Sequence, residues 1–174
     1  MSATEKIKIA FGRVSHAISR RPATGRGTKI SRASIKNGLT CEIREANWTM
    51  IADMPELNGG GAKGPTPGVY GRAALGSCLA IGYMMRAAAM DIPIEGIEVE
   101  IQADYDDAGF YGIAASIPAA YPEFRYLVRV DSQAPEEMIL RMLDEADRRS
   151  PYLEVYQRGQ SCRRQVIIIT EKKA

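Results

Sequence analysis

Apolar residues recur three and four positions apart near the start of the chain, with Lys and Arg between them. This spacing is typical of an amphipathic helix, in which one face is apolar and the other is charged. Pro22 follows the last apolar residue of the pattern, and a proline there stops the helix. We therefore predict a helix from Thr4 to Arg20. Its apolar positions are Ile7, Ala10, Phe11, Val14, Ala17 and Ile18.

Short β-like runs replace the helical spacing after this helix. They cover residues 29–36, 39–45 and 48–53. Asn37-Gly38 separates the first two runs and is the strongest hairpin signal of the chain, because both residue types accept the backbone of a tight turn. The pattern predicts a three-stranded meander. A loop rich in Gly and Pro follows it over 56–68.

A long apolar segment predicts the central helix of the fold. Over 69–90 one face carries apolar and small residues at helical spacing, and the opposite face is apolar too. A helix that is apolar all round lies in the interior of a domain. The Gly and Ala residues of this segment would let neighbouring backbones approach closely. Cys78 lies within it, among residues that a core would bury.

The second half of the chain predicts further strands and one more helix. The strands are expected over 94–106, 109–119, 124–132 and 162–170. Asp131 or Ser132 is expected to cap the helix, with acidic residues in its first turn. The apolar face of that helix consists of Met138, Ile139, Met142, Leu143 and Ala146. This order predicts a single α+β domain over 1–174, with antiparallel sheets around a buried helix.

Composition and charge exclude several classes of protein. The 174 residues are 45% hydrophobic and 25% charged, a soluble globular composition. No N-terminal stretch has the order of a signal peptide, and the longest nearly uncharged run, 73–85, is too short to span a bilayer. We expect a cytoplasmic protein with no membrane partner. Residues 1–36 carry nine Lys or Arg and one acid, but Phe11 is their only aromatic, so no nucleic-acid partner is expected.

The cysteines do not form the pattern of a disulfide framework or a metal site. They are Cys41, Cys78 and Cys162, and His16 is the only histidine, so we expect no metal and no cofactor. Cys78 lies about three turns into its helix, beyond the reach of the helix dipole. Arg72 lies off its face and Arg86 lies two turns away. The residue pattern alone therefore favours Cys78 as a small buried residue.

The segment GPTPGVYGRAALGSCLAIGYMMRAA, residues 64–88, resembles the helix signature of the OsmC/Ohr family of osmotically inducible and organic hydroperoxide resistance proteins. PELNGG before it, IEGIEVEIQADYD after it and the later EEMILRMLDEADRRSPY match the family's order of elements. The resemblance covers residues 28–170, and residues 1–22 look like a helical extension. It implies the OsmC-like fold, an intertwined homodimer and active sites built from both chains.

The resemblance also places Cys78 at the position of the family's peroxidatic cysteine. In the family this thiolate attacks an organic hydroperoxide and becomes a sulfenic acid, which a second cysteine resolves as a disulfide. Here Ser150, followed by Pro151, holds the position of the second cysteine, and Cys162 lies 12 residues beyond it. A second departure is Pro67-Gly68, where the family's peroxidases have Pro-Glu to orient an arginine. The two-cysteine cycle is therefore not expected in this chain.

Three functions remain open. The first is a peroxiredoxin-like, one-cysteine thiol peroxidase in the oxidative stress response, which reduces small organic hydroperoxides through Cys78 and uses an external thiol reductant. The second is a non-catalytic module that binds a small apolar ligand. The third is an interaction or scaffold protein in which Cys78 only fills space. An arginine near Cys78 would favour the thiol peroxidase. A dry apolar pocket without an arginine would favour the ligand-binding module. Ser150, Arg72 and Tyr70 are expected to line the site.

Overall fold

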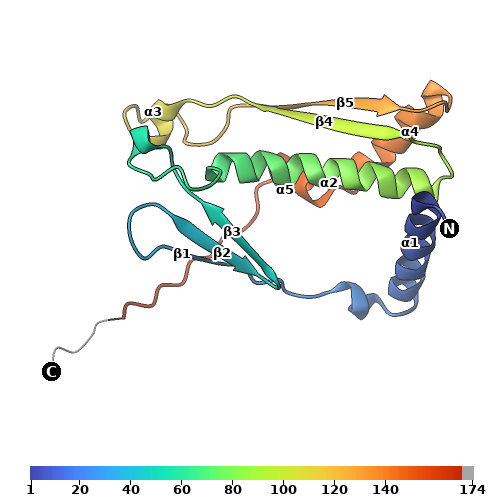
Figure 1. Ribbon diagram of the computed structural model, residues 1–174, viewed down its shortest axis with the longest axis horizontal. Coiled ribbons are helices and arrows are strands. Elements are labelled where there is room, and N and C mark those ends of the chain that lie inside the picture. The colour runs from blue at the N-terminus through green and yellow to red at the C-terminus, as the bar shows by residue number, and fades with distance from the viewer. Residues whose placement is uncertain (170–174) are drawn as a thin grey trace.

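The computed structural model describes residues 1–169. The helices are α1 (Ala3–Arg20), α2 (Pro67–Ala89), α3 (Asp107–Phe110), α4 (Glu136–Asp147) and α5 (Pro151–Gln157), with the 3₁₀ turns η1 (Pro22–Gly25) and η2 (Glu56–Asn58). The strands are β1 (Arg32–Ser34), β2 (Cys41–Glu45), β3 (Trp48–Ala52), β4 (Gly96–Ala103) and β5 (Phe124–Asp131). α2 runs through the middle, with the β4–β5 sheet on one side and the β1–β3 sheet on the other (Figure 1).

The central helix is confirmed, and it begins two residues earlier than predicted. Pro67 occupies the first turn of α2, where its missing N–H costs no hydrogen bond. One face of α2 packs against β4, α4 and α5. The buried core consists of Leu75, Leu79, Tyr83 and Ala87 from α2 together with Ile92, Met142, Ala146 and Leu153. The other face of α2 is less covered, and Ile81 remains 60% exposed.

The predicted N-terminal helix is also confirmed, as α1. It contacts the C-terminal part of α2, where Lys8 forms an ion pair with Asp91 and the Arg86 guanidinium lies 5.1 Å from the centre of the Phe11 ring. Ser2 caps the helix by accepting a hydrogen bond from the Glu5 N–H. No residue of α1 is fully buried, because the helix projects from the end of α2 (Figure 1).

The predicted meander is confirmed as β1–β3, with each strand antiparallel to the next. Gly38 has a φ of +62° in the first turn, and Ala46 has a φ of +48° in the second. The second turn is a tight hairpin, in which Ala46-Asn47 joins the paired residues Glu45 and Trp48, and Ala46 takes the left-handed conformation that such a turn requires. The first turn is a longer loop between the paired residues Ser34 and Glu42. Little of this sheet is buried in one chain. Ala52 is the only buried residue of its three strands, and Trp48 is 73% exposed.

Asp53 fastens the loop between β3 and α2. Its side chain is 1% exposed and accepts hydrogen bonds from the Thr40 hydroxyl and from the backbone N–H groups of Met54, Gly61 and Lys63. Burial opposes the charge, but the four donors outweigh it and hold the pKa of Asp53 below its ordinary value. The Gly-rich loop is therefore held in place where it enters α2.

One predicted strand is wrong. Residues 109–119 contain the end of the short helix α3 and a loop, not a strand. Asp106 starts α3 by accepting a hydrogen bond from the Ala108 N–H at 2.9 Å. Ile113 is 77% exposed, so the alternating pattern of this segment covers no core surface. Alternation marks a strand only where one face is buried against something.

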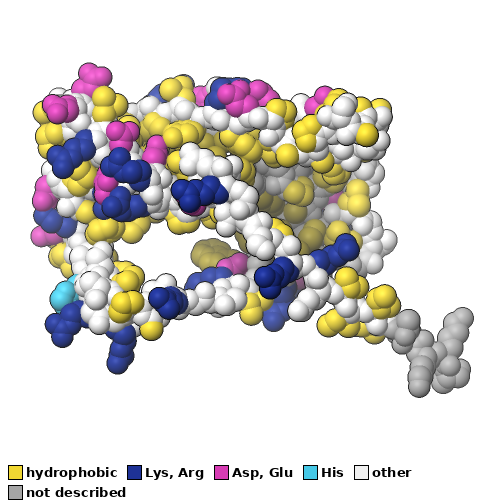
Figure 2. Space-filling view, turned by 180° about the vertical axis from the view of Figure 1, so that it is seen from behind, with side chains coloured by type: hydrophobic (Ala, Val, Ile, Leu, Met, Phe, Trp, Pro, Cys, Tyr) yellow, Lys and Arg dark blue, Asp and Glu magenta, His cyan; other side chains and the backbone are white. Residues whose placement is uncertain are grey.

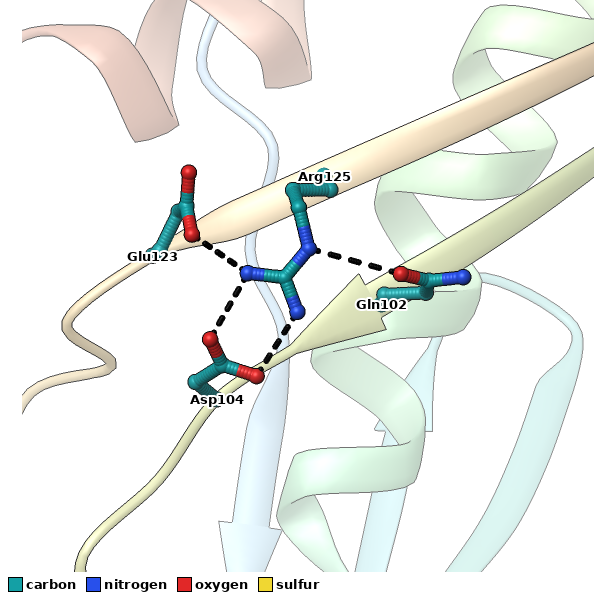
Figure 3. Close-up of polar contacts among 4 residues, drawn as sticks. All are labelled: Gln102, Asp104, Glu123 and Arg125. Atoms are coloured by element: carbon teal, nitrogen blue, oxygen red, sulfur yellow. Dashed lines mark hydrogen bonds and ion pairs between the residues drawn. The ribbon is translucent and has the colours of Figure 1, made fainter.

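The strands on either side of this loop pair directly as β4 and β5. Their antiparallel register runs from Gly96 opposite Asp131 to Ala103 opposite Phe124. Arg125 closes the end of the pair: its guanidinium contacts both oxygens of Asp104, at 2.7 and 2.8 Å, and also Glu123 and Gln102 (Figure 3). The hydrogen bonds from Arg125 hold the pKa of Asp104 below its ordinary value.

The predicted helix after β5 is present as α4, but the expected cap is wrong. Asp131 ends β5, and the Ser132 hydroxyl donates to the Pro93 carbonyl and accepts from the Ala134 N–H. Pro135 takes the N-cap position, and no side chain caps the helix. Ser132 is therefore used to fold the turn before α4, because its oxygen lies too early in the chain to reach the first helical turn.

The predicted last strand is not formed within the described residues. Residues 162–169 have no regular structure, and Thr170 lies outside the described part of the chain. Val166, Ile167, Ile168 and Ile169 are exposed. A strand needs a neighbouring strand to pair its backbone N–H and C=O groups, and no strand of residues 1–169 pairs with this segment. The pattern also failed to predict α5 as a separate helix.

Candidate functional site

Cys78 meets Ser150 where α2 passes the start of α5. The Cys78 Sγ and the Ser150 Oγ are 3.5 Å apart, and either atom can be the donor. Ser150 is buried and is the N-cap of α5, where its Oγ accepts a hydrogen bond from the Leu153 N–H. Its hydroxyl hydrogen is then free to point to the sulfur. The residues are 72 positions apart in the sequence and are brought together by the fold.

Two tyrosines hold the segment that carries Ser150. Tyr83 of α2 and Tyr126 of β5 both donate to the Asp147 carboxylate, at 2.7 and 2.8 Å. Burial and the nearby carboxylate raise the pKa of Tyr83 far above its ordinary value and the pKa of Tyr126 to about 12. Both hydroxyls therefore stay protonated near neutral pH and tie the end of α4 to its neighbours. Ser150 lies three residues after Asp147, and its N–H donates a hydrogen bond to the Asp147 carbonyl.

A cavity of about 580 Å³ opens beside Cys78. Its volume lies within the range of small-molecule sites, about 300–1,000 Å³. Most of the side chains around it are apolar or small, which is a setting for a ligand with an apolar body. The lining comes from α1, α2, the end of α4 and the start of α5: Phe11, Ala74, Ser77, Cys78, Ile81, Gly82, Met85, Arg86, Ala146, Arg149, Ser150, Pro151 and Tyr152.

The charged side chains of this lining are all cationic. Arg86 and Arg149 contribute guanidinium groups, and no Asp or Glu among residues 1–169 lines the cavity. Arg149 is held by Glu145, one helical turn earlier, at 2.6 Å. Arg86 has no carboxylate partner among residues 1–169 and lies over the Phe11 ring. The cavity thus combines a half-buried thiol, a buried hydroxyl and positive charge.

Tyr70 and Arg72 lie elsewhere. The Tyr70 hydroxyl donates to the Ile51 carbonyl at 2.7 Å, which ties the start of α2 to β3. Arg72 lies beside Gly68 in the first turns of α2. Neither residue lines the cavity next to Cys78. In one chain, therefore, Tyr70 and Arg72 do not lie beside Cys78, because both are nearer to the N-terminal end of α2.

Gly68 has a local reason to be glycine. A Cβ atom at this position would lie 2.8 Å from the Tyr121 hydroxyl, closer than real Cβ contacts come. A glutamate here would have to displace Tyr121, whose ring packs against Phe124 at 4.9 Å between centroids. The departure from Pro-Glu at Pro67-Gly68 is therefore accommodated by the aromatic side chains at this end of α2.

No second cysteine lies beside Cys78. All three cysteines are free, and Cys162 is exposed in the segment after α5. Among residues 1–169, no three His, Cys, Asp or Glu side chains gather in a way that could hold a metal ion. No helix in that part of the chain is long and apolar enough to cross a membrane.

The amino-acid sequence of this chain matches the model of a protein family. The family model described as OsmC-like protein matches residues 59–163, more than half of the 174 residues. The chain belongs to the OsmC family. The matched part holds α2, β4, β5, α4 and α5, and therefore both Cys78 and Ser150. No curated protein matches the chain.

Solved structures show the same OsmC fold at low sequence identity. An OsmC-like protein from Mycoplasma pneumoniae has a TM-score of 0.65 at 16% identity, over 75% of this chain and 88% of its own. An organic hydroperoxide resistance protein OsmC from Legionella pneumophila has a TM-score of 0.53 at 15% identity, over 76% and 90%. An organic hydroperoxide resistance protein from Elizabethkingia anophelis has a TM-score of 0.57 at 14% identity, over 77% of this chain and 90% of its own.

The sequence did not identify several residues of the OsmC-like pocket. The sequence predicts Phe11 on the apolar face of an amphipathic helix, and Arg149 lies within the EEMILRMLDEADRRSPY segment without any signal of its own. Arg86 was considered too distant along the helix from Cys78. The signal that could have found it is the period itself: Cys78, Met85 and Arg86 share one side of a helix across two turns. Phe11 had no such signal, because it joins the pocket through tertiary contact.

Proposed function

We propose that this OsmC-like protein is a one-cysteine, thiol-dependent peroxidase that reduces small organic hydroperoxides through Cys78. The observation that carries the proposal is the place of the Cys78 sulfur: it lines a largely apolar cavity, 3.5 Å from the Ser150 hydroxyl. An apolar wall suits the organic part of a hydroperoxide. Two guanidinium groups, those of Arg86 and Arg149, also line the cavity and give it positive charge.

In the proposed first step the Cys78 thiolate attacks the distal oxygen of the hydroperoxide. A sulfur–oxygen bond forms, the O–O bond breaks, and the leaving alkoxide takes up a proton as an alcohol. The sulfur loses two electrons and becomes a sulfenic acid, while the peroxide gains them. The Ser150 hydroxyl can donate a hydrogen bond to the thiolate before the attack, at the observed 3.5 Å.

An external thiol completes the cycle in this proposal. Ser150 stands beside Cys78, and an alcohol oxygen cannot form the disulfide that would resolve a sulfenic acid. A first external thiol would attack the oxidised sulfur and release water, and a second would release Cys78 as a thiol. The two external sulfurs leave as a disulfide. This chemistry needs a supply of reduced thiols, so we place the protein in the cytoplasm.

The test is consumption of cumene hydroperoxide by the reduced protein, with mass spectrometry of the Cys78 peptide. We expect peroxide loss equal to the protein added and a gain of about 16 Da, one oxygen atom, on Cys78. A thiol reductant should make the loss catalytic. Cys78→Ser should reduce the rate to the buffer background, whereas Cys162→Ser should leave it unchanged. Peroxide loss that persists in Cys78→Ser would sink the proposal.

We further propose that the protein is a homodimer. Its apolar side chains are left uncovered in one chain: Ile81 on α2 is 60% exposed and Ile169 in the tail is 88% exposed. Figure 2 shows hydrophobic side chains gathered in the hollow between the part that holds α2 and the part that holds β1–β3. A soluble monomer rarely exposes such extended apolar surface, and a second copy could cover it. The strand-like tail would then find a partner for its backbone.

The dimer is tested by light scattering during size-exclusion chromatography. We expect twice the chain mass of 19.1 kDa. Ile81→Glu should shift the protein to the monomer, since it places a charge on the exposed apolar face of α2. Leu140→Glu is the matched control, because Leu140 is 53% exposed among charged residues of α4 and should keep the dimer. A wild-type mass of a single chain at micromolar concentration would contradict the proposal.

A further inference from the structure

The cavity beside Cys78 has a wall that lies outside the OsmC family match. Phe11 of α1 lines it, whereas the match covers residues 59–163. From this wall and from the positive charge of the lining, we propose that the cavity binds a small amphipathic anion, and that Arg86 binds its anionic group. Such a ligand has an apolar body and one anionic group. The inference deepens the proposed function by naming the class of substrate, and it rests on that function for the chemistry at Cys78.

The charge of the lining points to an anion. Arg86 and Arg149 are its two formal charges, and both are positive. Arg149 is already paired with Glu145, so its charge is largely compensated. Arg86 has no such partner among residues 1–169, although it is half-buried. An anionic ligand would give this guanidinium the partner that it lacks. The hydrogen bonds between them would be charge-assisted, and such bonds are stronger than those between neutral groups.

The position of Arg86 is fixed by α1. The guanidinium carbon lies 5.1 Å from the centre of the Phe11 ring, within the range of a cation–π contact. The ion pair of Lys8 with Asp91 holds α1 at this end of α2. One face of the guanidinium is thus occupied by the ring, while its N–H groups at the edge remain available. A held guanidinium loses less conformational entropy when it binds an anion.

The rest of the lining suits an apolar body. Met85 and Ala146 offer aliphatic surface, and Pro151 and Tyr152 contribute from the start of α5. The volume of about 580 Å³ admits a molecule of two or three rings or a medium-length alkyl chain. A ligand anchored by its anionic group at Arg86 would extend along α2 toward Cys78, because both residues line one cavity.

A pair of dyes tests the proposal without any redox chemistry. 8-Anilinonaphthalene-1-sulfonate has an apolar body and one sulfonate, and N-phenyl-1-naphthylamine has the same ring system without the charge. Fluorescence titration of the Cys78→Ser protein should show tighter binding of the sulfonate. Arg86→Gln should weaken the sulfonate about tenfold and leave the uncharged dye nearly unchanged. Arg141→Gln, an exposed arginine outside the cavity, should change neither affinity.

Arg86→Lys is the control for a folding defect in Arg86→Gln. It keeps the positive charge and should therefore retain most of the sulfonate affinity. The proposal is overturned if Arg86→Gln leaves the sulfonate affinity unchanged, or if it weakens both dyes equally. The dye contrast without peroxide turnover would sink the peroxidase and keep the anion site. Peroxide turnover without the contrast would sink the anion site and keep the peroxidase.

Discussion

Replacing Ser150 with cysteine is expected to change the oxidised product at Cys78 from a sulfenic acid to a disulfide. The Ser150 oxygen already lies 3.5 Å from the Cys78 sulfur, and a sulfur in its place needs only a small side-chain adjustment to bond. After peroxide treatment the Ser150→Cys protein should lose about 2 Da, two hydrogens, where the wild type gains about 16 Da, one oxygen. Intact-mass and peptide mass spectrometry measure the difference.

Ser150→Ala is the matched control for this substitution. It removes the same hydroxyl and the same helix cap but supplies no thiol, so its oxidised form should still carry the added oxygen. Cys78→Ser combined with Ser150→Cys should form no disulfide at this site. If Ser150→Cys keeps the added oxygen on Cys78 and never forms a disulfide between positions 78 and 150, the two side chains do not meet in solution as they do in the structure.

Leu79→Ala should give the largest loss of stability among single substitutions near the site. Leu79 is 1% exposed in the core that joins α2 to α4 and α5. Deleting its three outer carbons leaves a cavity that close-packed neighbours fill only in part, at a cost of about 3 kcal/mol in the free energy of unfolding. Urea unfolding at one fixed protein concentration measures this cost.

Leu140→Ala provides the comparison for the same change of side chain. Leu140 is 53% exposed on α4, so its truncation should alter the free energy of unfolding by less than about 0.5 kcal/mol. Equal losses in the two leucine variants would mean that the interior of α2 does not carry the stability of the domain. The site would then be held together by another part of the chain.

The periodic segments of the chain were predictable because their local pattern and their environment agree. Helical spacing in the first twenty residues predicted α1, and an all-round apolar segment predicted the central helix α2. Asn37-Gly38 predicted the first turn of the meander because few residue types accept its backbone. By contrast, 109–119 alternates like a strand and forms a loop, since nothing packs against it.

The site was only partly predictable for the same reason. The resemblance selected Cys78 and Ser150, and the structure brings the two side chains together. Tyr70 and Arg72 were predicted to line the site from their place at the start of the central helix, and in one chain neither lines the cavity beside Cys78. Phe11 and Arg149 join the lining from other helices, and no local pattern marks a residue that reaches a site through tertiary contact.

The sequence by itself determined the strongly periodic elements, α1, α2 and the β1–β3 meander, because backbone propensity and apolar spacing act within a few residues. It also determined the chemistry on offer: one thiol in the central helix and no second thiol at position 150. Only the tertiary structure decided what surrounds that thiol. The approach of α1, α4 and α5 to α2 depends on the packing of residues far apart in the chain, and this packing placed Phe11, Arg149 and Ser150 around the Cys78 cavity.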